Sequence, residues 1–174
     1  MLPPLTFILG GAASGKSKIA ENLVISTGRP RVYLATAQAF DDEMKTKVAA
    51  HLTQRGSDWT TIEEPVDVAS RLTERDTDQI LLLDCVTLWL SNIILAERDE
   101  AADGAALMKA LEDAPCPVVV VSNEVGLGIV PDNALSRRFR GAQGRLNQAL
   151  AAQAGLVVNV VAGLPQILKG TWPE

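Results

Sequence analysis

Eight residues near the start of the chain have the types and the spacing of a phosphate-binding loop. They are Gly10, Gly11, Ala12, Ala13, Ser14, Gly15, Lys16 and Ser17. An apolar run at residues 5–9 precedes them and an amphipathic stretch follows from Lys18, which is the strand, glycine loop and helix of a P-loop. Glycines let successive N–H groups turn toward a phosphate, and the helix dipole adds positive charge behind them. We predict that Lys16 binds the β and γ phosphates of a nucleoside triphosphate and that Ser17 binds Mg²⁺.

A second acidic element follows the apolar run at residues 80–83, which ends in Asp84. A buried strand here would carry the Asp84 carboxylate to the edge of a sheet, where it could hold the same Mg²⁺ directly or through water. Many apolar strands end in aspartate, so this run is informative only because a P-loop accompanies it. We therefore predict Asp84 as a second metal residue.

The order of the predicted elements indicates an α/β fold. Strands are expected at residues 5–9, 31–36, 80–84, 118–122 and 156–161, alternating with helices at 18–27, 41–52, 66–75, 87–95, 105–114 and 134–154. This alternation predicts one P-loop NTPase-type domain spanning residues 1–174, with a mainly parallel sheet and helices on both faces. Residues 59–64 are expected to form a short strand or an extended loop, residues 98–104 a polar connector, and the tail to Glu174 a poorly ordered or short helical segment.

Composition excludes some classes of function. The chain has 174 residues, of which 47% are hydrophobic and 4% aromatic, and its net charge is −5. A general nucleic-acid binder needs a basic stripe that neutralises phosphates, so we expect no nucleic-acid partner. No apolar segment approaches the ~20 residues of a membrane span, and no signal peptide is evident, so we expect a cytoplasmic protein. Cys85 and Cys116 lie in apolar runs and are expected to be buried.

Two further features allow more than one interpretation. Arg137, Arg138, Arg140 and Arg145 lie in the first half of the predicted helix 134–154, where they could bind phosphates or form a solvated face. His51, the chain's one histidine, lies near an apolar stripe, and a packed or surface residue is the commoner explanation for such a position. A nucleotide-driven switch would need an effector surface for a partner, and a nucleic-acid motor would need basic or aromatic contacts to a strand, whereas only 4% of the residues are aromatic. A small-molecule kinase is therefore favoured.

Four stretches resemble one known family over nearly the whole chain. They are residues 10–17; 35–37 with 41–44; 123–131; and 139–140 with 144–148. The family is the bifunctional adenosylcobinamide kinase and adenosylcobinamide-phosphate guanylyltransferase family of cobalamin biosynthesis. The resemblance implies that adenosylcobinamide is phosphorylated on its aminopropanol hydroxyl and that GMP is then transferred from GTP to the resulting adenosylcobinamide phosphate. The family carries GMP on a histidine, and the matching position here is His51.

The resemblance also implies a set of binding residues. Nucleotide contacts would come from Gly10, Gly11, Ala12, Ala13, Ser14, Gly15, Lys16, Ser17, Ala35, Thr36, Ala37, Thr53, Gln54, Arg55 and Gly56, while Glu63 and Asp84 would hold the guanine, ribose or metal side unless either acid is a structural cap. The cofactors would be GTP, with ATP as an alternative phosphate donor, and Mg²⁺. The protein would be a homo-oligomer, a trimer in this family, and the apolar stretch 88–95 is a candidate subunit-facing helix.

The sequence departs from the family pattern at three positions. Ala13 stands where arginine is common, Ala50 where a second histidine is frequent, and Gly141 where aspartate is common. The Ala13 departure would weaken triphosphate binding or change the phosphate donor. A P-loop kinase of another small alcohol is the alternative among enzymes. A nucleotide-binding switch or assembly protein, which forms no covalent adduct, is the alternative from a different class.

Overall fold

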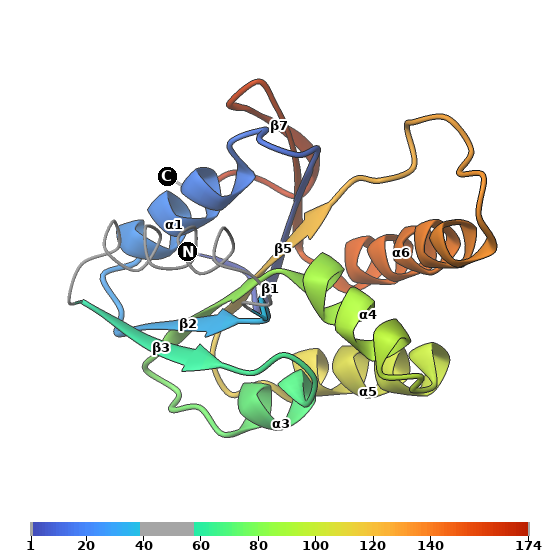
Figure 1. Ribbon diagram of the computed structural model, residues 1–174. Helices are drawn as coiled ribbons and strands as arrows, with labels where there is room; N and C mark the ends of the chain where they lie inside the picture. The colour runs from blue at the N-terminus through green and yellow to red at the C-terminus, as the bar shows by residue number, and fades with distance from the viewer. Residues whose placement is uncertain (1, 39–57, 174) are drawn as a thin grey trace.

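The computed structural model describes residues 2–38 and 58–173 (Figure 1). In these residues one sheet has the strand order β3-β2-β4-β5-β1-β6-β7. The strands are β1 (Leu5–Gly10), β2 (Arg31–Ala35), β3 (Trp59–Glu63), β4 (Ile80–Asp84), β5 (Val118–Asn123), β6 (Leu156–Val161) and β7 (Leu164–Lys169). The helices are α1 (Lys16–Ser26), α3 (Val68–Thr73), α4 (Val86–Leu95), α5 (Glu100–Asp113) and α6 (Ala134–Gln153).

Every neighbouring pair of strands is parallel except β6 and β7. Parallel strands place their carboxyl ends at one edge of the sheet, and ligands of such folds bind outside that edge. The register puts Gly10 of β1 beside Asn123 of β5, and Ala35 of β2 beside Asp84 of β4. The predicted α/β class is therefore confirmed, and Gly10, Ala35 and Asp84 lie at this edge.

Helices cover both faces of the sheet, as Figure 1 shows. Ala20, Leu23 and Val24 of α1 pack on one face against alternate strand residues such as Ile8 and Leu82. Helices α3 to α6 pack on the other face against the intervening strand residues. Strand side chains alternate between the faces, so a continuous apolar run such as residues 80–83 is buried on both sides.

The C-terminal tail was predicted wrongly. Residues 164–169 form the antiparallel edge strand β7 instead of a poorly ordered or helical segment. The turn before it carries Ala162 and Gly163 at φ 52° and 78°, and a two-residue turn with both φ values positive matches the twist of a β-hairpin. All six residues of β7 are exposed, so the strand shows no buried apolar alternation in its sequence.

The connector predicted at residues 98–104 was also wrong, because α5 begins at Glu100. The Asp99 side chain caps this helix and accepts hydrogen bonds from the N–H groups of Ala101 and Ala102, at 2.9 and 3.1 Å. The acidic residues Glu100 and Asp103 of the first turn, followed by Gly104, hid the start of the helix from hydrophobic periodicity. The extended segment 59–64 is a strand, β3, at the edge of the sheet.

Helix α4 is buried inside the chain. Trp89, Leu90 and Ile93 are almost inaccessible and belong to the apolar cluster that joins α4 to the sheet and to the neighbouring helices. Its apolar composition is explained by this packing without a second subunit.

In the described part of the chain, no helix is both long enough and apolar enough to cross a membrane.

Candidate nucleotide-binding site

The loop between β1 and α1 is shaped by its backbone. Gly15 has φ 91°, in the left-handed region that glycine tolerates, and a Cβ there would stand 3.2 Å from the Cα of Gly163. A Cβ on Gly10 would stand 2.5 Å from Ser14 Oγ and 2.7 Å from the carbonyl oxygen of Val160. Glycine at both positions therefore lets the loop fold tightly against the end of β6.

Two polar side chains of this loop, those of Ser14 and Lys16, are buried. Lys16, 9% exposed, donates a hydrogen bond from Nζ to the carbonyl oxygen of Gly11, at 3.1 Å. The Ser14 hydroxyl is buried and has no hydrogen-bond partner among the described residues. Buried polar groups are costly without partners, and a phosphate would supply acceptors for both. The loop thus fits a nucleotide phosphate, and Ser17 follows Lys16 at the first turn of α1.

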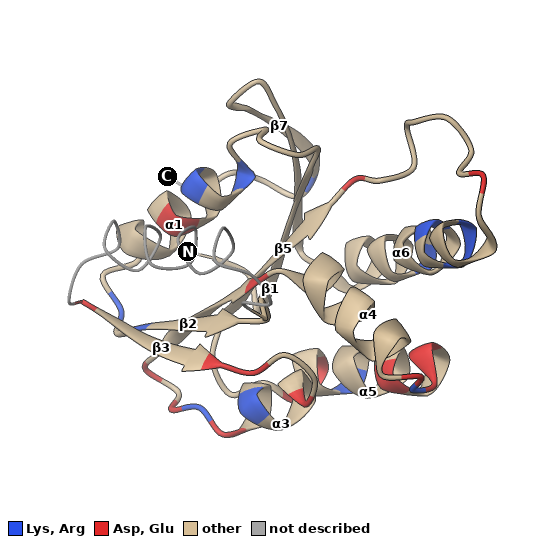
Figure 2. Cartoon of the chain, in the orientation of Figure 1, with Lys and Arg blue, Asp and Glu red and all other residues tan. Residues whose placement is uncertain are grey.

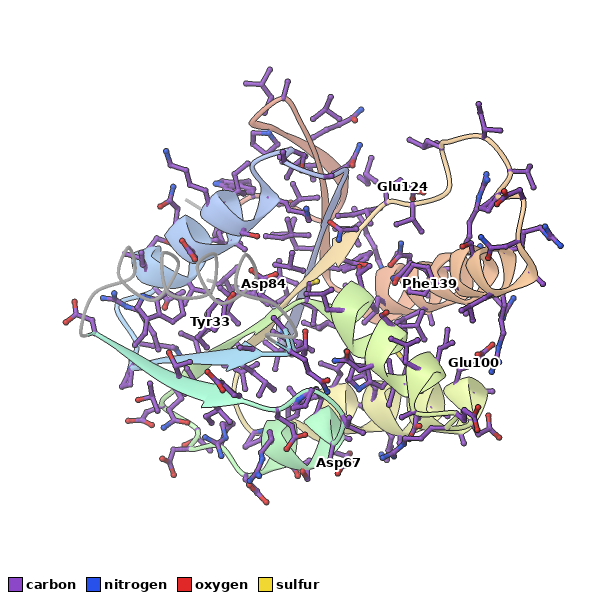
Figure 3. The ribbon with its side chains drawn as sticks, viewed as in Figure 1. Tyr33, Asp67, Asp84, Glu100, Glu124 and Phe139 are labelled. Atoms are coloured by element: carbon purple, nitrogen blue, oxygen red, sulfur yellow. The ribbon has the colours of Figure 1, made fainter. Side chains whose placement is uncertain are left out.

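Asp84 lies at the carboxyl end of β4, two strands away from β1. Its Oδ2 accepts a hydrogen bond from the Tyr33 hydroxyl at 3.0 Å, and Figure 3 shows the two side chains close together between β2 and β4. Among the described residues no group of three or more His, Cys, Asp or Glu could hold a metal ion. In nucleotide sites Mg²⁺ is bound by one or two protein groups together with phosphate oxygens, so a donor set of Ser17 and Asp84 fits this ion.

Thr36 connects the end of β2 to the end of β4 through hydrogen bonds with Cys85. Its hydroxyl donates to the carbonyl oxygen of Cys85 at 2.7 Å and accepts from the N–H of Cys85 at 3.0 Å. The Thr36 carbonyl accepts from Asn92 Nδ2 at 2.9 Å. The Thr36 side chain is fully buried, so these contacts hold β2 beside β4, and Ala35 and Ala37 flank it at the edge of the sheet.

Burial and the Asp84 carboxylate raise the pKa of the Cys85 thiol to about 11, with a smaller opposing effect from Lys16. Cys85 is therefore a neutral thiol at physiological pH, and it is buried, as Cys116 is. Both cysteines are free thiols, and their burial agrees with the sequence-based expectation.

Glu63 ends the edge strand β3 and is exposed. The adjacent Glu64 is the acid with a structural function, because its Oε1 accepts from the N–H groups of Val66 and Asp67 at 3.2 and 2.9 Å. The structure does not describe six predicted or departing positions, Ala50, His51, Thr53, Gln54, Arg55 and Gly56. The whole of the predicted helix 41–52 also lies outside the described residues.

The arginines of α6 are held by other parts of the chain. Arg140 donates to the carbonyl oxygens of Gly126 and of Ile129, the latter at 3.1 Å. Arg137 donates to those of Pro131 and Asp132 at 2.9 and 2.7 Å. Arg138 and Arg145 approach the Glu100 carboxylate at 2.8 and 3.7 Å. Figure 2 shows this basic group at the start of α6, away from the loop before α1, so the arrangement favours a structural function for it.

The sequence did not reveal a buried polar network between α4, β5 and α6. Thr87, Ser122, Gln143 and Asn147 are at most 8% exposed, and their side chains are hydrogen-bonded to one another. These residues are separated by up to 60 positions, so no local pattern unites them. The signal was the presence of Thr87 and Ser122 within the apolar elements α4 and β5, whereas Gln143 and Asn147 lie in a helix with many other polar residues.

The parallel sheet, the glycine loop between β1 and α1, and the carboxylate that ends β4 place the chain in the class of P-loop nucleotide-binding proteins. Solved structures support this fold. A RadB recombinase superposes with a TM-score of 0.56 at 17% identity, covering 91% of this chain and 74% of that one. An ATPase from a bacterial type III secretion system superposes with a TM-score of 0.55 at 13% identity, covering 94% of this chain and 56% of that one.

The chain belongs to the cobinamide kinase / cobinamide phosphate guanyltransferase family, whose sequence model matches residues 6–168. It is 46% identical over 166 residues to the bifunctional adenosylcobalamin biosynthesis protein CobP of Pseudomonas aeruginosa, covering 94% of this chain and 96% of that protein. It is 40% identical to the bifunctional adenosylcobalamin biosynthesis protein CobU of Salmonella typhimurium, covering 95% and 99%. The family identified from the sequence is confirmed, and with it the prediction of a bifunctional enzyme that uses nucleotides and acts on cobinamide substrates.

Proposed function

We propose that this one domain first phosphorylates the aminopropanol hydroxyl of adenosylcobinamide and then transfers GMP from GTP to adenosylcobinamide phosphate, giving adenosylcobinamide-GDP and diphosphate. The observation that carries the proposal is the family match over residues 6–168, which includes the P-loop at its expected place. The proposed cofactors are GTP, with ATP as an alternative phosphate donor, and Mg²⁺.

In the kinase step, the loop from Gly10 to Ser17 would hold the triphosphate. The Lys16 ammonium would leave the Gly11 carbonyl oxygen for the β and γ phosphate oxygens, where it offsets the negative charge of the transferring group. Ser17 and Asp84 would hold Mg²⁺, which supplies further charge neutralisation at the phosphates. Tyr33 would keep the Asp84 carboxylate in place through its hydroxyl.

In the guanylyl transfer, a nitrogen of the His51 imidazole would attack the α phosphorus of GTP, and diphosphate would leave. A phosphate oxygen of adenosylcobinamide phosphate would then attack the same phosphorus and release His51. Two displacements let one residue serve two substrates in turn, and a neutral imidazole is a competent nucleophile near pH 7. His51 is the chain's one histidine, so no other residue could form a phosphohistidine.

The remaining predicted contacts complete the proposed site. Ala35, Thr36 and Ala37 at the end of β2, the segment from Thr53 to Gly56, and Glu63 would contact the nucleotide. Among these, Thr36 would act through the backbone that it positions, because its hydroxyl is already hydrogen-bonded to Cys85. We further propose a cytoplasmic trimer, on the basis of the resemblance.

The test is turnover of the purified chain with adenosylcobinamide, GTP and Mg²⁺, following both corrinoid products by chromatography. We expect adenosylcobinamide phosphate to appear first and adenosylcobinamide-GDP to follow. EDTA is expected to stop both steps. Replacing adenosylcobinamide with other small alcohols tests the alternative kinase, and GTP hydrolysis without any corrinoid product would favour the switch.

A further inference from the structure

A ring of hydrogen bonds closes on the backbone of Asn123 at the end of β5. The Asn123 N–H donates to Thr87 Oγ1 at 2.7 Å, and Asn147 Nδ2 donates to the Asn123 carbonyl oxygen at 3.3 Å. Between them, Ser122 Oγ donates to Asn147 Oδ1 at 2.7 Å and lies 3.3 Å from Thr87 Oγ1. The one hydroxyl hydrogen of Ser122 goes to Asn147, so Thr87 is the donor to Ser122. The ring therefore occupies both backbone polar groups of Asn123.

The ring is buried and rigid. Ser122 is fully buried, and Thr87 and Asn147 are 6% and 8% exposed. Gln143, also fully buried, donates from Nε2 to both Ser122 Oγ at 3.0 Å and Asn147 Oδ1 at 2.9 Å. In a medium of low dielectric these bonds reinforce one another and are costly to break. Helices α4 and α6 thus fix one backbone position of β5.

Asn123 lies between the phosphate-binding loop that follows β1 and Asp84 at the end of β4. Strand β5 runs between β1 and β4, and Asn123 pairs with Gly10, the first residue of the phosphate-binding loop. The next residue, Glu124, donates its N–H to the Gly10 carbonyl oxygen at 3.0 Å. Figure 3 shows Glu124 at the start of the connection to α6.

The Asn123 side chain lies on the face of the sheet that α1 covers. Successive strand residues point to opposite faces, and Ser122 points to the α4 and α6 face, where it meets Thr87 and Asn147. Asp84 is on the α1 face, because it bonds Tyr33, which packs with the α1 residues. Asn123 and Asp84 thus share a face and an edge, and the Asn123 carboxamide makes no hydrogen bond within the described residues.

We propose that the Asn123 carboxamide donates a hydrogen bond to the transferring phosphoryl group in the kinase step, and that Thr87, Ser122 and Asn147 are positioning residues that aim it. The inference rests on the proposed function. Negative charge spreads over the equatorial oxygens of the phosphoryl group in the transition state, so a donor beside the loop stabilises it. Such a donor is effective only when it is held in place beforehand, and the ring holds the backbone that carries it.

Asn123→Ala in the full chain tests the catalytic residue. We expect kcat for adenosylcobinamide phosphorylation to fall about 100-fold, as for removal of one preorganised donor, with KM for GTP within about twofold of wild type. Asn123→Asp keeps the size but loses the donor, and is expected to be as impaired. Asn159→Ala on β6, another partly buried strand asparagine, is the matched control and should keep its kcat. An unchanged kcat in Asn123→Ala would overturn the inference.

Ser122→Ala and Thr87→Val test the ring. Each should lower kcat by about tenfold without raising KM for GTP, because a misaimed donor loses part of its effect. In the double variant Asn123→Ala with Ser122→Ala, kcat should be no lower than in Asn123→Ala alone, since the ring acts through Asn123. A loss of thermal stability with wild-type kcat, or multiplying losses in the double variant, would make the ring merely structural and overturn its assigned role. A wild-type chain without kinase activity would instead overturn the proposed function itself.

Discussion

Two connections leave neighbouring strands at the same edge of the sheet, and they are built in different ways. The connection from β1 to α1 is short, and its form depends on glycine: Gly15 has a positive φ, and the site of its Cβ is blocked. The connection from β5 to α6, residues 124–133, is long and is held by side chains from other elements, chiefly Arg137 and Arg140 of α6. Gly10 and Asn123, where the two begin, are paired in the sheet.

The difference shows how local and non-local encoding contribute to one site. The first connection leaves the Ser14 hydroxyl without a hydrogen-bond partner among the described residues, and so free to bind a phosphate. The second uses its polar contacts to fix its own backbone, while Leu127 and Ile129 remain 91% and 96% exposed. Substitutions in the first should therefore affect nucleotide chemistry, and those in the second should affect loop order.

Lys16→Ala should produce the largest effect. We expect kcat/KM for the kinase step to fall by about 100- to 1,000-fold, because the charge that faces the transferring phosphate is removed. The fold should be kept, since within the described part of the chain Lys16 Nζ makes a single hydrogen bond, to the carbonyl oxygen of Gly11. Lys18→Ala, an exposed lysine on the same helix, is the control. Wild-type kinase kinetics in Lys16→Ala would contradict the role of the loop.

Gly15→Ala tests the backbone encoding of the first connection. At φ 91° an alanine is strained, and its Cβ would press on Gly163, so we expect a loss of about 1–2 kcal/mol in the free energy of unfolding and weaker GTP binding. Gly104→Ala in α5 has open space at the Cβ position and should be neutral or slightly stabilising. Urea denaturation and calorimetric titration with GTP would measure both. Equal effects from the two variants would argue against a strained loop.

Arg140→Ala tests the non-local encoding of the second connection. Loss of its bonds to Gly126 and Ile129 should release residues 124–132, so limited proteolysis there should become several times faster, at a stability cost of about 1 kcal/mol. Arg140→Lys should not restore protection, because lysine lacks the planar fork that reaches two carbonyl oxygens. Unchanged cleavage in Arg140→Ala would mean that the loop is held by other contacts.

Arg138→Ala should have the smallest effect. Its exposed ion pair with Glu100 is worth at most about 1 kcal/mol, and KM for GTP should stay unchanged. The measurements are urea denaturation and steady-state kinetics in parallel. A tenfold rise in KM for GTP would restore the phosphate-binding interpretation of the arginine cluster.

The contrast between local and non-local encoding also explains what could be predicted from the sequence. The P-loop, the five apolar strands and Asp84 were recognisable because short local patterns encode them. The hairpin strand β7 was missed because its residues are exposed, and the start of α5 because its first turn is polar. The ring around Asn123 joins residues from three elements that only the fold brings together. The resemblance assigned His51 its role, which periodicity alone did not favour.

The most direct test of the account uses GTP labelled at the α phosphate. The chain is incubated with it and Mg²⁺, denatured, and examined for retained label, with His51→Ala and Lys16→Ala in parallel. We expect label that is labile in acid, stable in alkali and absent from His51→Ala, as a phosphoramidate on histidine requires. Retention of the same label by His51→Ala, or no label in the wild type under conditions where GTP binds, would contradict transfer of GMP through His51.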